Sequence, residues 1–266
     1  MLIAASVAAA AAVVSGTMVS VLSGHSDGGH PSRFPAAGGG AGSNASIDLA
    51  AAIVLRNAGK AAGEQQGGWP NAAYWTVTSV YERNGKTYHR DIWISHRGNG
   101  VLEDDGVFGS MIPINLGRNI FPAGAANLTW DQLYALPTDP AKLEPVLRSA
   151  IESAGPNATA ELYSVVADLL PESPASPALR EALYEVVANI PGVKLLGHYK
   201  DALGRTGTAV ERDGETLVID PNTGQLLADI QGNPSTGLSC GRGCVTYGVA
   251  YTYVSEGPAS RAPAGR

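Results

Sequence analysis

The sequence predicts an α+β fold in which a curved antiparallel sheet has a helical cluster inserted between two groups of strands. Strand-like runs rich in Tyr, Trp, Thr and Val occupy 72–82 and 86–97. Helical periodicity then takes over between residues 128 and 190, and strand-like runs return from 193 to 254. Strands that do not alternate one by one with helices favour antiparallel pairing over βαβ units.

The first group of strands follows a helix expected over 46–66, with Ser46 as its cap and an apolar stripe at helical spacing. Asn84-Gly85 between the two long strand-like runs is a hairpin turn that tolerates positive φ. Weaker strand signals lie at 101–102 and 107–112.

The helical cluster is predicted from its start signals. Thr129 is placed to cap a short helix at 128–133, and Asp139 before Pro140 predicts a helix over 141–153. Apolar spacing predicts a helix over 159–170, and Ser176 before Pro177 starts another that runs to about residue 190.

The last part of the chain returns to strands, separated by turns at Asp213-Gly214 and 220–224. The strands are expected at 193–199, 206–212, 215–220, 225–231 and 245–254. We expect 256–266 to be a disordered tail.

The N-terminal segment predicts where the protein works. The first 26 residues contain no Asp, Glu, Lys or Arg, and 1–22 as a helix would be about 33 Å long, enough for a hydrocarbon core of about 30 Å. We interpret 1–24 as a transmembrane anchor or signal segment, and favour the anchor. A cleaved signal and a buried Ala-rich helix are the alternatives. His25 stands where a lipoprotein signal requires Cys, which excludes lipidation.

A Gly-, Ser- and Pro-rich stretch at 25–46 follows and predicts a flexible linker. The domain at 47–255 is therefore expected outside the membrane of a single-pass protein. The net charge is −6 without a cluster of Lys and Arg, which argues against nucleic acid and against docking on anionic lipid.

Cys240 and Cys244 are the two cysteines of the chain. A glycine-spaced pair in an exported chain predicts a disulfide, with a metal site or two free thiols as the alternatives. Zinc requires four ligands, and no His lies near the pair in the sequence.

No pattern in the sequence predicts a catalytic residue, a metal site or a cofactor. Gly237–Gly241 matches a nucleophile elbow, but neither a helix nor a His follows it. Glu103–Gly106 lacks the spacing of a calcium loop and is interpreted as a solvated turn. His89 and His96 are expected on opposite faces of one strand, and His198 is interpreted as a loop residue.

Aromatic side chains are concentrated between residues 69 and 93. They predict either a cross-strand aromatic core or an apolar groove on the sheet that binds lipid or a partner peptide. Trp75 and Trp93 are the candidate ligand-binding residues.

The chain resembles an uncharacterised actinobacterial family of membrane-anchored proteins often encoded beside extracytoplasmic-function sigma factors. The matching stretches occur in the order Ala73–Ser79, Leu128–Pro140, Val165–Leu170, Pro191–Val193, Asp201–Gly207 and Ile219–Leu227. The resemblance implies one transmembrane helix and an exported domain, and it implies no catalytic residues. The order of strands and helices is also similar to the half-barrel of periplasmic lipoprotein carriers, a likeness of fold alone.

From these observations we expect a non-enzymatic sensor or binding domain in the cell envelope, linked to sigma-factor regulation. Its expected partners are the membrane and either a regulatory protein or an apolar envelope ligand. The alternative is a carrier of lipid or lipoprotein with an apolar cavity.

Overall fold

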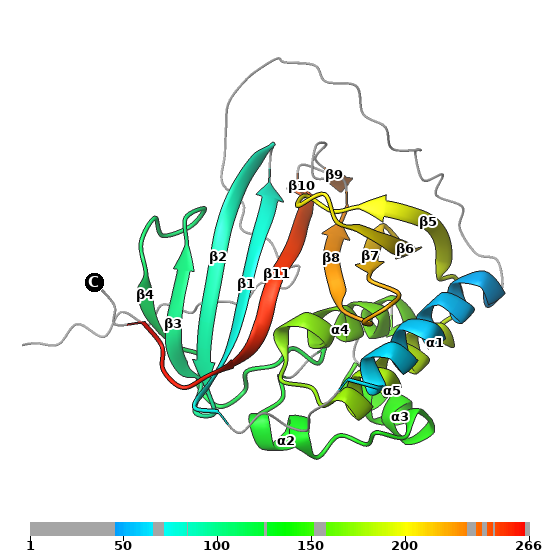
Figure 1. Cartoon of the computed structure of the whole chain (residues 1–266), viewed down its shortest axis with the longest axis horizontal. Helices are drawn as coiled ribbons and strands as arrows, with labels where there is room; N and C mark the ends of the chain where they lie inside the picture. Colours follow the sequence, from blue (N-terminus) through cyan, green and yellow to red (C-terminus); the bar gives the residue numbers. More distant parts are fainter. Residues whose placement is uncertain are drawn as a thin grey trace, which may run out of the picture.

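The computed structural model describes residues 46–65, 72–83, 85–124, 127–151, 158–232, 238–240, 244–246 and 248–263. Across these ranges the chain forms one large antiparallel sheet with helices packed below it (Figure 1). The helical cluster lies in the chain between two groups of strands, so the α+β prediction is confirmed in its main features.

Within the described residues, nine strands join in the order β4-β3-β2-β1-β11-β8-β7-β6-β5. Their bounds are β1 Tyr74–Arg83, β2 Lys86–Ser95, β3 Asn99–Asp104, β4 Ile112–Asn115, β5 Lys194–Lys200, β6 Thr206–Arg212, β7 Glu215–Ile219, β8 Leu226–Gln231 and β11 Val249–Ala259. A separate pair is formed by β9 (Leu238–Cys240) and β10 (Cys244–Thr246). The C-terminal strand β11 therefore lies between the group β1–β4 and the group β5–β8 and joins them into one sheet; we call this junction the seam.

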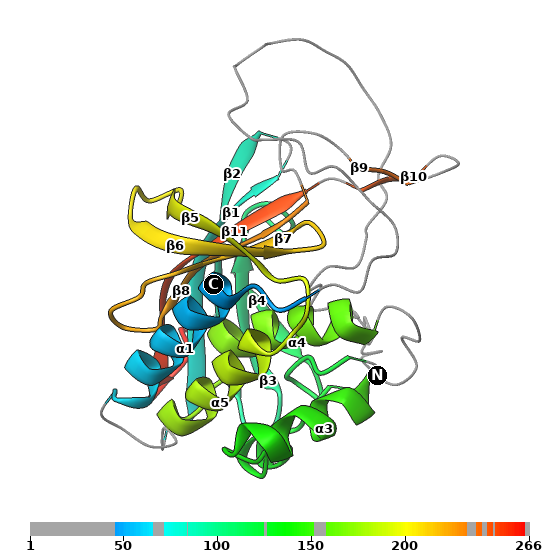
Figure 2. The same cartoon turned by 90° about the vertical axis from the view of Figure 1, so that its right-hand side faces the viewer.

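The sheet is strongly curved, and β5 and β6 cross the direction of β1 and β2 steeply in the view of Figure 2. At the seam, β8 pairs with β11 only over Val249–Thr252. Beyond that point the two strands separate. Arg205 bridges them there, because its guanidinium donates to the carbonyl oxygens of Tyr253 at 2.6 Å and Leu227 at 3.3 Å.

The helices of the described residues are α1 Leu49–Gly63, α2 Trp130–Tyr134, α3 Pro140–Ala150, α4 Ala158–Glu172 and α5 Pro177–Ala188. Small residues bring α1 close to α5: a Cβ added at Gly59 would lie 2.9 Å from the Cβ of Tyr184. Leu162 and Val166 on α4, like Leu183 on α5, are fully buried in the core between helices and sheet. The hydrophobic effect of this core holds the helices to the sheet.

The expected start of α1 is wrong by two residues. Asp48, rather than Ser46, is the N-cap, and its carboxylate accepts hydrogen bonds from the backbone N–H groups of Ala50 and Ala51. The same carboxylate accepts from the N–H of Leu195 at 3.3 Å. This hydrogen bond joins Asp48 to β5. The sequence of the helix alone cannot predict it, because Leu195 lies far along the chain.

The expected disordered tail at 256–266 is also wrong in its first part. β11 continues to Ala259, and its residues from Glu256 onward pair with β1 between Tyr74 and Val77. Pro258 is tolerated because β11 pairs there with β1 on one side only, after it has separated from β8.

The expected anchor at 1–24 and the linker up to residue 45 lie outside the described residues. Among the residues that are described, no helix is long and apolar enough to cross a membrane.

Candidate binding site

Trp75 and Trp93 do not lie together. In the β1–β2 hairpin Trp75 is opposite Ile94, and Trp93 is opposite Thr76. Because side chains alternate along a strand, the two indoles point to opposite faces of the sheet. Trp75 faces the core and is 6% exposed, whereas Trp93 is half-buried on the other face. The Asn84-Gly85 pattern in the sequence predicts this separation, because residues 83 and 86 pair directly and residue 94 is then opposite residue 75.

The histidines are also dispersed. His89 is exposed on β2 beside Asp91, with 2.9 Å between Nε2 and Oδ2. His96 lies after the end of β2 and stacks on Trp130 with ring centroids 3.9 Å apart. His198 is part of β5 rather than of a loop, because that strand runs to Lys200. The described residues contain no group of three or more His, Cys, Asp and Glu placed to hold a metal ion.

The segment Glu103–Gly106 differs from the solvated turn that the sequence predicts. Asp104 ends β3 and is buried, with 7% of its surface exposed. Its Oδ1 accepts a 2.7 Å hydrogen bond from the Tyr81 hydroxyl and a 3.0 Å hydrogen bond from the N–H of Gly106. The expected strand at 107–112 begins only at Ile112. Residues 105–111 instead form a loop between β3 and β4, which we call the tip loop.

The tip loop is held by many contacts near its start. The backbone N–H groups of Val107 and Phe108 donate to the Asp104 carbonyl at 3.2 and 2.8 Å. Asp105 Oδ1 accepts from the N–H of His89 at 2.6 Å. Gly106 has no room for a side chain, since a Cβ there would lie 2.1 Å from the Tyr81 hydroxyl oxygen. The backbone at the start of this loop is therefore fixed by the strands beneath it.

A tyrosine cluster supports the loop from β1, β2 and β11. The ring of Tyr81 lies 5.2 Å from that of Tyr88 and 5.3 Å from that of Tyr251. Arg83 places its guanidinium over Tyr81 and Tyr88 at 5.8 and 5.5 Å and donates to the Gly106 carbonyl at 3.2 Å. Burial, followed by the hydrogen bond to Asp104, raises the pKa of Tyr81 well above its usual value. Tyr81 therefore remains a neutral hydrogen-bond donor.

The outer side of the tip loop is apolar. Val107 is 57% exposed and Phe108 is 41% exposed. The buried Asp104 and the Arg83 guanidinium hold the start of the loop to the strands, and Val107 and Phe108 are exposed just after it. Pre-organised apolar side chains of this kind suit binding, because little conformational entropy is lost on contact.

A second polar network lies deeper, between the sheet and α4. Arg90 on β2 pairs with Glu172 at the end of α4 at 3.3 Å. Glu215 on β7 accepts a 2.5 Å hydrogen bond from the Ser164 hydroxyl. Burial raises the pKa of Glu215 to about 7, and burial followed by the charge of Glu215 raises the pKa of Asp229 well above its usual value. These groups join the strands to the helix under them.

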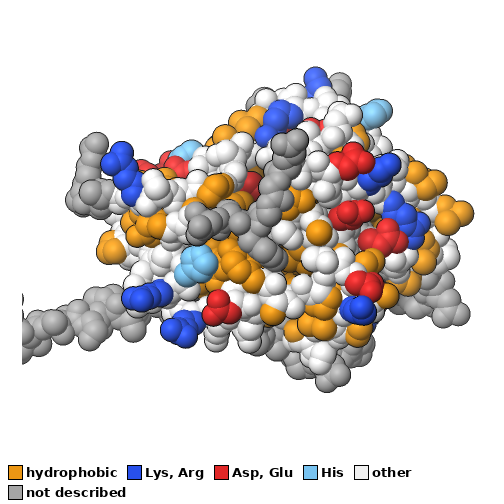
Figure 3. Space-filling view, turned by 60° about the horizontal axis from the view of Figure 1, so that its bottom comes forward, with side chains coloured by type: hydrophobic (Ala, Val, Ile, Leu, Met, Phe, Trp, Pro, Cys, Tyr) orange, Lys and Arg blue, Asp and Glu red, His pale blue; other side chains and the backbone are white. Residues whose placement is uncertain are grey.

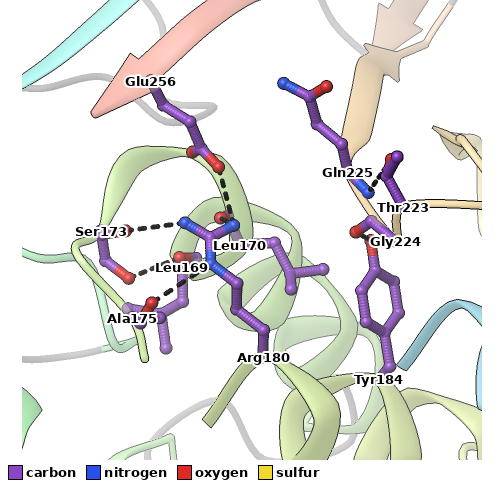
Figure 4. Close-up of polar contacts among 10 residues, drawn as sticks. All are labelled: Leu169, Leu170, Ser173, Ala175, Arg180, Tyr184, Thr223, Gly224, Gln225 and Glu256. Carbon is purple, nitrogen blue, oxygen red and sulfur yellow. Dashed lines mark hydrogen bonds and ion pairs between the residues drawn. The ribbon is translucent and has the colours of Figure 1, made fainter. Parts of the chain in front are cut away.

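Arg180 fixes the corner between α4 and α5 (Figure 4). It donates to the carbonyl oxygens of Leu170 at 2.6 Å, Ala175 at 3.2 Å and Ser173 at 3.3 Å. It also pairs with Glu256 on β11 at 2.8 Å. Burial raises the pKa of Glu256, and the Arg180 charge opposes that rise. This contact ties the extended end of β11 to the helices.

The cysteines are placed by backbone pairing alone. β9 and β10 pair antiparallel with Cys240 directly opposite Cys244. Cα atoms of directly opposed residues lie at the separation a disulfide spans, and their side chains lie outside the described residues, so the disulfide stays a prediction. Ser239 also lies in β9, and the strand β10 follows in the chain where a nucleophile elbow requires a helix.

The surface of the helical side carries acidic and basic side chains interspersed with hydrophobic ones (Figure 3). On this face no one sign of charge dominates among the described residues. Figure 3 therefore shows, on this face of the described residues, no stripe of basic side chains of the kind that nucleic-acid recognition uses.

No family model and no curated protein matches the chain. Among solved structures, a crystal structure of MucB is 17% identical, covers 82% of this chain and has a TM-score of 0.29. A structure of MucB in complex with MucA(peri) is 16% identical, covers 80% of this chain and has a TM-score of 0.27. The chain spans 61% and 57% of the length of those two chains. TM-scores of this size carry no inference about function.

Proposed function

We propose that this chain is a non-enzymatic binding domain, anchored outside the cell membrane by residues 1–22, that recognises a regulatory protein through the tip loop. The observation that carries the proposal is the exposure of Val107 and Phe108 on a loop fixed by the buried Asp104. The sigma-factor context rests on the family resemblance of the sequence.

The chemistry of the tip loop favours binding over catalysis. The charged groups on the strands beside it already have partners: Asp104 accepts from Tyr81 and Gly106, and Arg83 donates to Gly106. A general acid or base must reach a substrate, whereas these groups face the strands. What the loop offers to a partner is an aromatic side chain and a β-branched one.

A protein partner suits this surface better than a small ligand. A projecting aromatic side chain acts as an anchor when it enters a pocket on another protein, and such anchors supply much of the binding energy in interfaces. Small ligands instead enter concave sites. Phe108 is therefore the expected anchor and Val107 its apolar neighbour.

A sensor role requires that binding be linked to a second conformation. The tip loop is connected to the helices through β2, because His89 bonds to the loop and Arg90 next to it pairs with Glu172 on α4. A partner that binds one arrangement of these elements more tightly would shift the population toward it.

The alternative is a carrier of lipid or lipoprotein, which requires an apolar cavity. The core side chains between the sheet and the helices, Val166, Leu183 and Leu217 among them, are fully buried and in contact. Among the described residues no specific contact favours the carrier.

Gene expression in cells tests the proposal. A deletion of the gene is compared with a Val107→Ser/Phe108→Ser variant and with Val146→Ser, which changes a valine on α3 that is 45% exposed. We expect the deletion and the tip variant to change the same sigma-factor-dependent transcripts, and Val146→Ser to behave like the wild type. A deletion without effect on such transcripts would refute the regulatory role, and a silent tip variant would refute the site.

A further inference from the structure

Four apolar side chains are exposed where the described chain begins. Ile47 is 42% exposed, Leu49 73%, Ile53 58% and Leu196 54%. We call them the entry patch. Single exposed apolar residues are ordinary, whereas a contiguous group of them is typical of an interaction surface.

Two hydrogen bonds join the segment that carries Ile47 and Leu49 to the segment that leads into Leu196. The Ser46 carbonyl accepts a hydrogen bond from the N–H of Gly192 at 3.2 Å, and Asp48 accepts one from the N–H of Leu195 at 3.3 Å. The start of α1 therefore lies against the start of β5 (Figures 1 and 2). Leu49 and Ile53 are one helical turn apart and share a face of α1.

The charged groups around the patch are engaged with other atoms or lie at its rim. The Asp48 carboxylate accepts from three backbone N–H groups, which lower its pKa. Arg56 pairs with Glu185 at 2.9 Å. Lys194 is exposed two residues before Leu196 and makes no ion pair with any residue that the structure describes. An apolar surface can enter the headgroup region of a bilayer through the apolar area that it buries, and this contact does not need the cluster of Lys and Arg that the chain lacks.

We propose that the entry patch docks on the lipid surface of the membrane that holds the anchor. This inference rests on the anchor in the proposed function. The chain leaves the domain at Ser46, beside the patch, and the 23 residues between residue 22 and Ser46 would span about 26 Å as a Gly-rich coil. So short a tether holds the domain near the bilayer and favours contact by the surface where the tether attaches.

Docking would also orient the site. In Figure 1 the start of α1 lies at the right of the molecule, and the loop between β3 and β4 lies at the left. A domain that rests on lipid through the entry patch leaves the tip loop free for a partner protein.

The test uses the full chain in nanodiscs that contain brominated phospholipid. A polarity-sensitive fluorescent amino acid replaces Leu49 in one sample and Val146, an exposed residue of α3, in the matched control. We expect brominated lipid to quench the label at 49 and not at 146. Adding Ile53→Asp should reduce the equilibrium constant for docking about tenfold, since it replaces an apolar contact by a charge.

The outcomes separate the docking from the anchor. Carbonate washing first establishes whether the chain stays in the membrane. If carbonate releases the chain from the membrane, both the anchor and the docking are refuted. An anchored chain whose label at 49 is quenched no more than the label at 146 overturns the docking and leaves the anchor standing.

Discussion

Tyr81 on β1 and Asp104 at the end of β3 are joined by a 2.7 Å hydrogen bond that passes beside the intervening strand β2. Both residues are buried, and the same carboxylate oxygen also accepts from Gly106. One buried acid thus links the middle of the sheet to the backbone of the tip loop.

Removing the Tyr81 hydroxyl should loosen the loop. Tyr81→Phe leaves a buried carboxylate with one donor fewer, which should cost about 1–3 kcal/mol of unfolding free energy. Amide exchange at 105–111 should become faster. Tyr88→Phe is the matched control, because no hydrogen bond of its hydroxyl is found among the described residues. Equal exchange in the two variants would show that the hydrogen bond does not order the loop.

Stability should fall as pH rises through the range where Glu215 ionises. The pKa of Glu215 is raised from 4.5 to about 7 by burial, with Glu161 on α4 adding to the rise and the Ser164 hydroxyl opposing it. A raised pKa in the folded state means that ionisation favours unfolding, so stability is greatest below pH 4.5 and decreases toward pH 7. The nearby Asp229 carboxyl, also raised, acts in the same direction.

Glu215→Gln tests this dependence, because the amide keeps the shape without the charge. Its melting temperature at pH 8 should exceed that of the wild type by at least about 3 °C, with little difference at pH 4. Glu64→Gln, at an exposed position after α1, should change neither. A wild-type profile that is flat between pH 4 and 8 would contradict the burial of an ionisable Glu215.

Arg180 should matter more than an exposed arginine. Arg180→Met leaves three carbonyl oxygens and the largely buried Glu256 without their donor, so we expect a loss of about 3–5 kcal/mol. Arg56→Met breaks the more exposed pair with Glu185 and should cost about 0–1 kcal/mol. Chemical denaturation measures both, and similar losses would mean that the Arg180 corner is not a stabilising contact.

Cys240 and Cys244 should form a disulfide in the exported protein. They lie directly opposite each other in the β9–β10 pair, and an oxidising compartment would keep them bonded. Mass spectrometry after alkylation without a reductant should find neither thiol labelled. Two alkylated thiols in protein taken from the envelope would refute the disulfide.

Local signals in the sequence predicted much of the fold. Thr129, Asp139 and Ser176 cap their helices as expected, because each cap needs only its own helix. Asp48 was missed although it too caps its own helix through Ala50 and Ala51; its further bond to Leu195 lies far along the chain. The end of β11 was missed because Gly257 and Pro258 suggest coil, and only pairing with β1 makes them a strand.

The candidate site was harder to predict. Its central contact joins residues 23 positions apart in the chain, and a run of acidic residues before Gly106 gives no sign that one of them is buried. The exposed Phe108 follows closely in the chain, and its backbone N–H bonds to the Asp104 carbonyl. The sequence therefore predicted that aromatic strands would matter but placed the contacts on Trp75 and Trp93, which lie on opposite faces.

Photo-crosslinking in living cells tests the central claim most directly. A photoreactive amino acid is placed at Phe108 and, as the matched control, at Val146 on α3. We expect one protein adduct of defined mass from position 108, none from 146, and loss of the adduct when Tyr81→Phe is added to release the loop. The absence of an adduct at 108, or the same adduct from both positions, would contradict recognition of a partner protein through the tip loop.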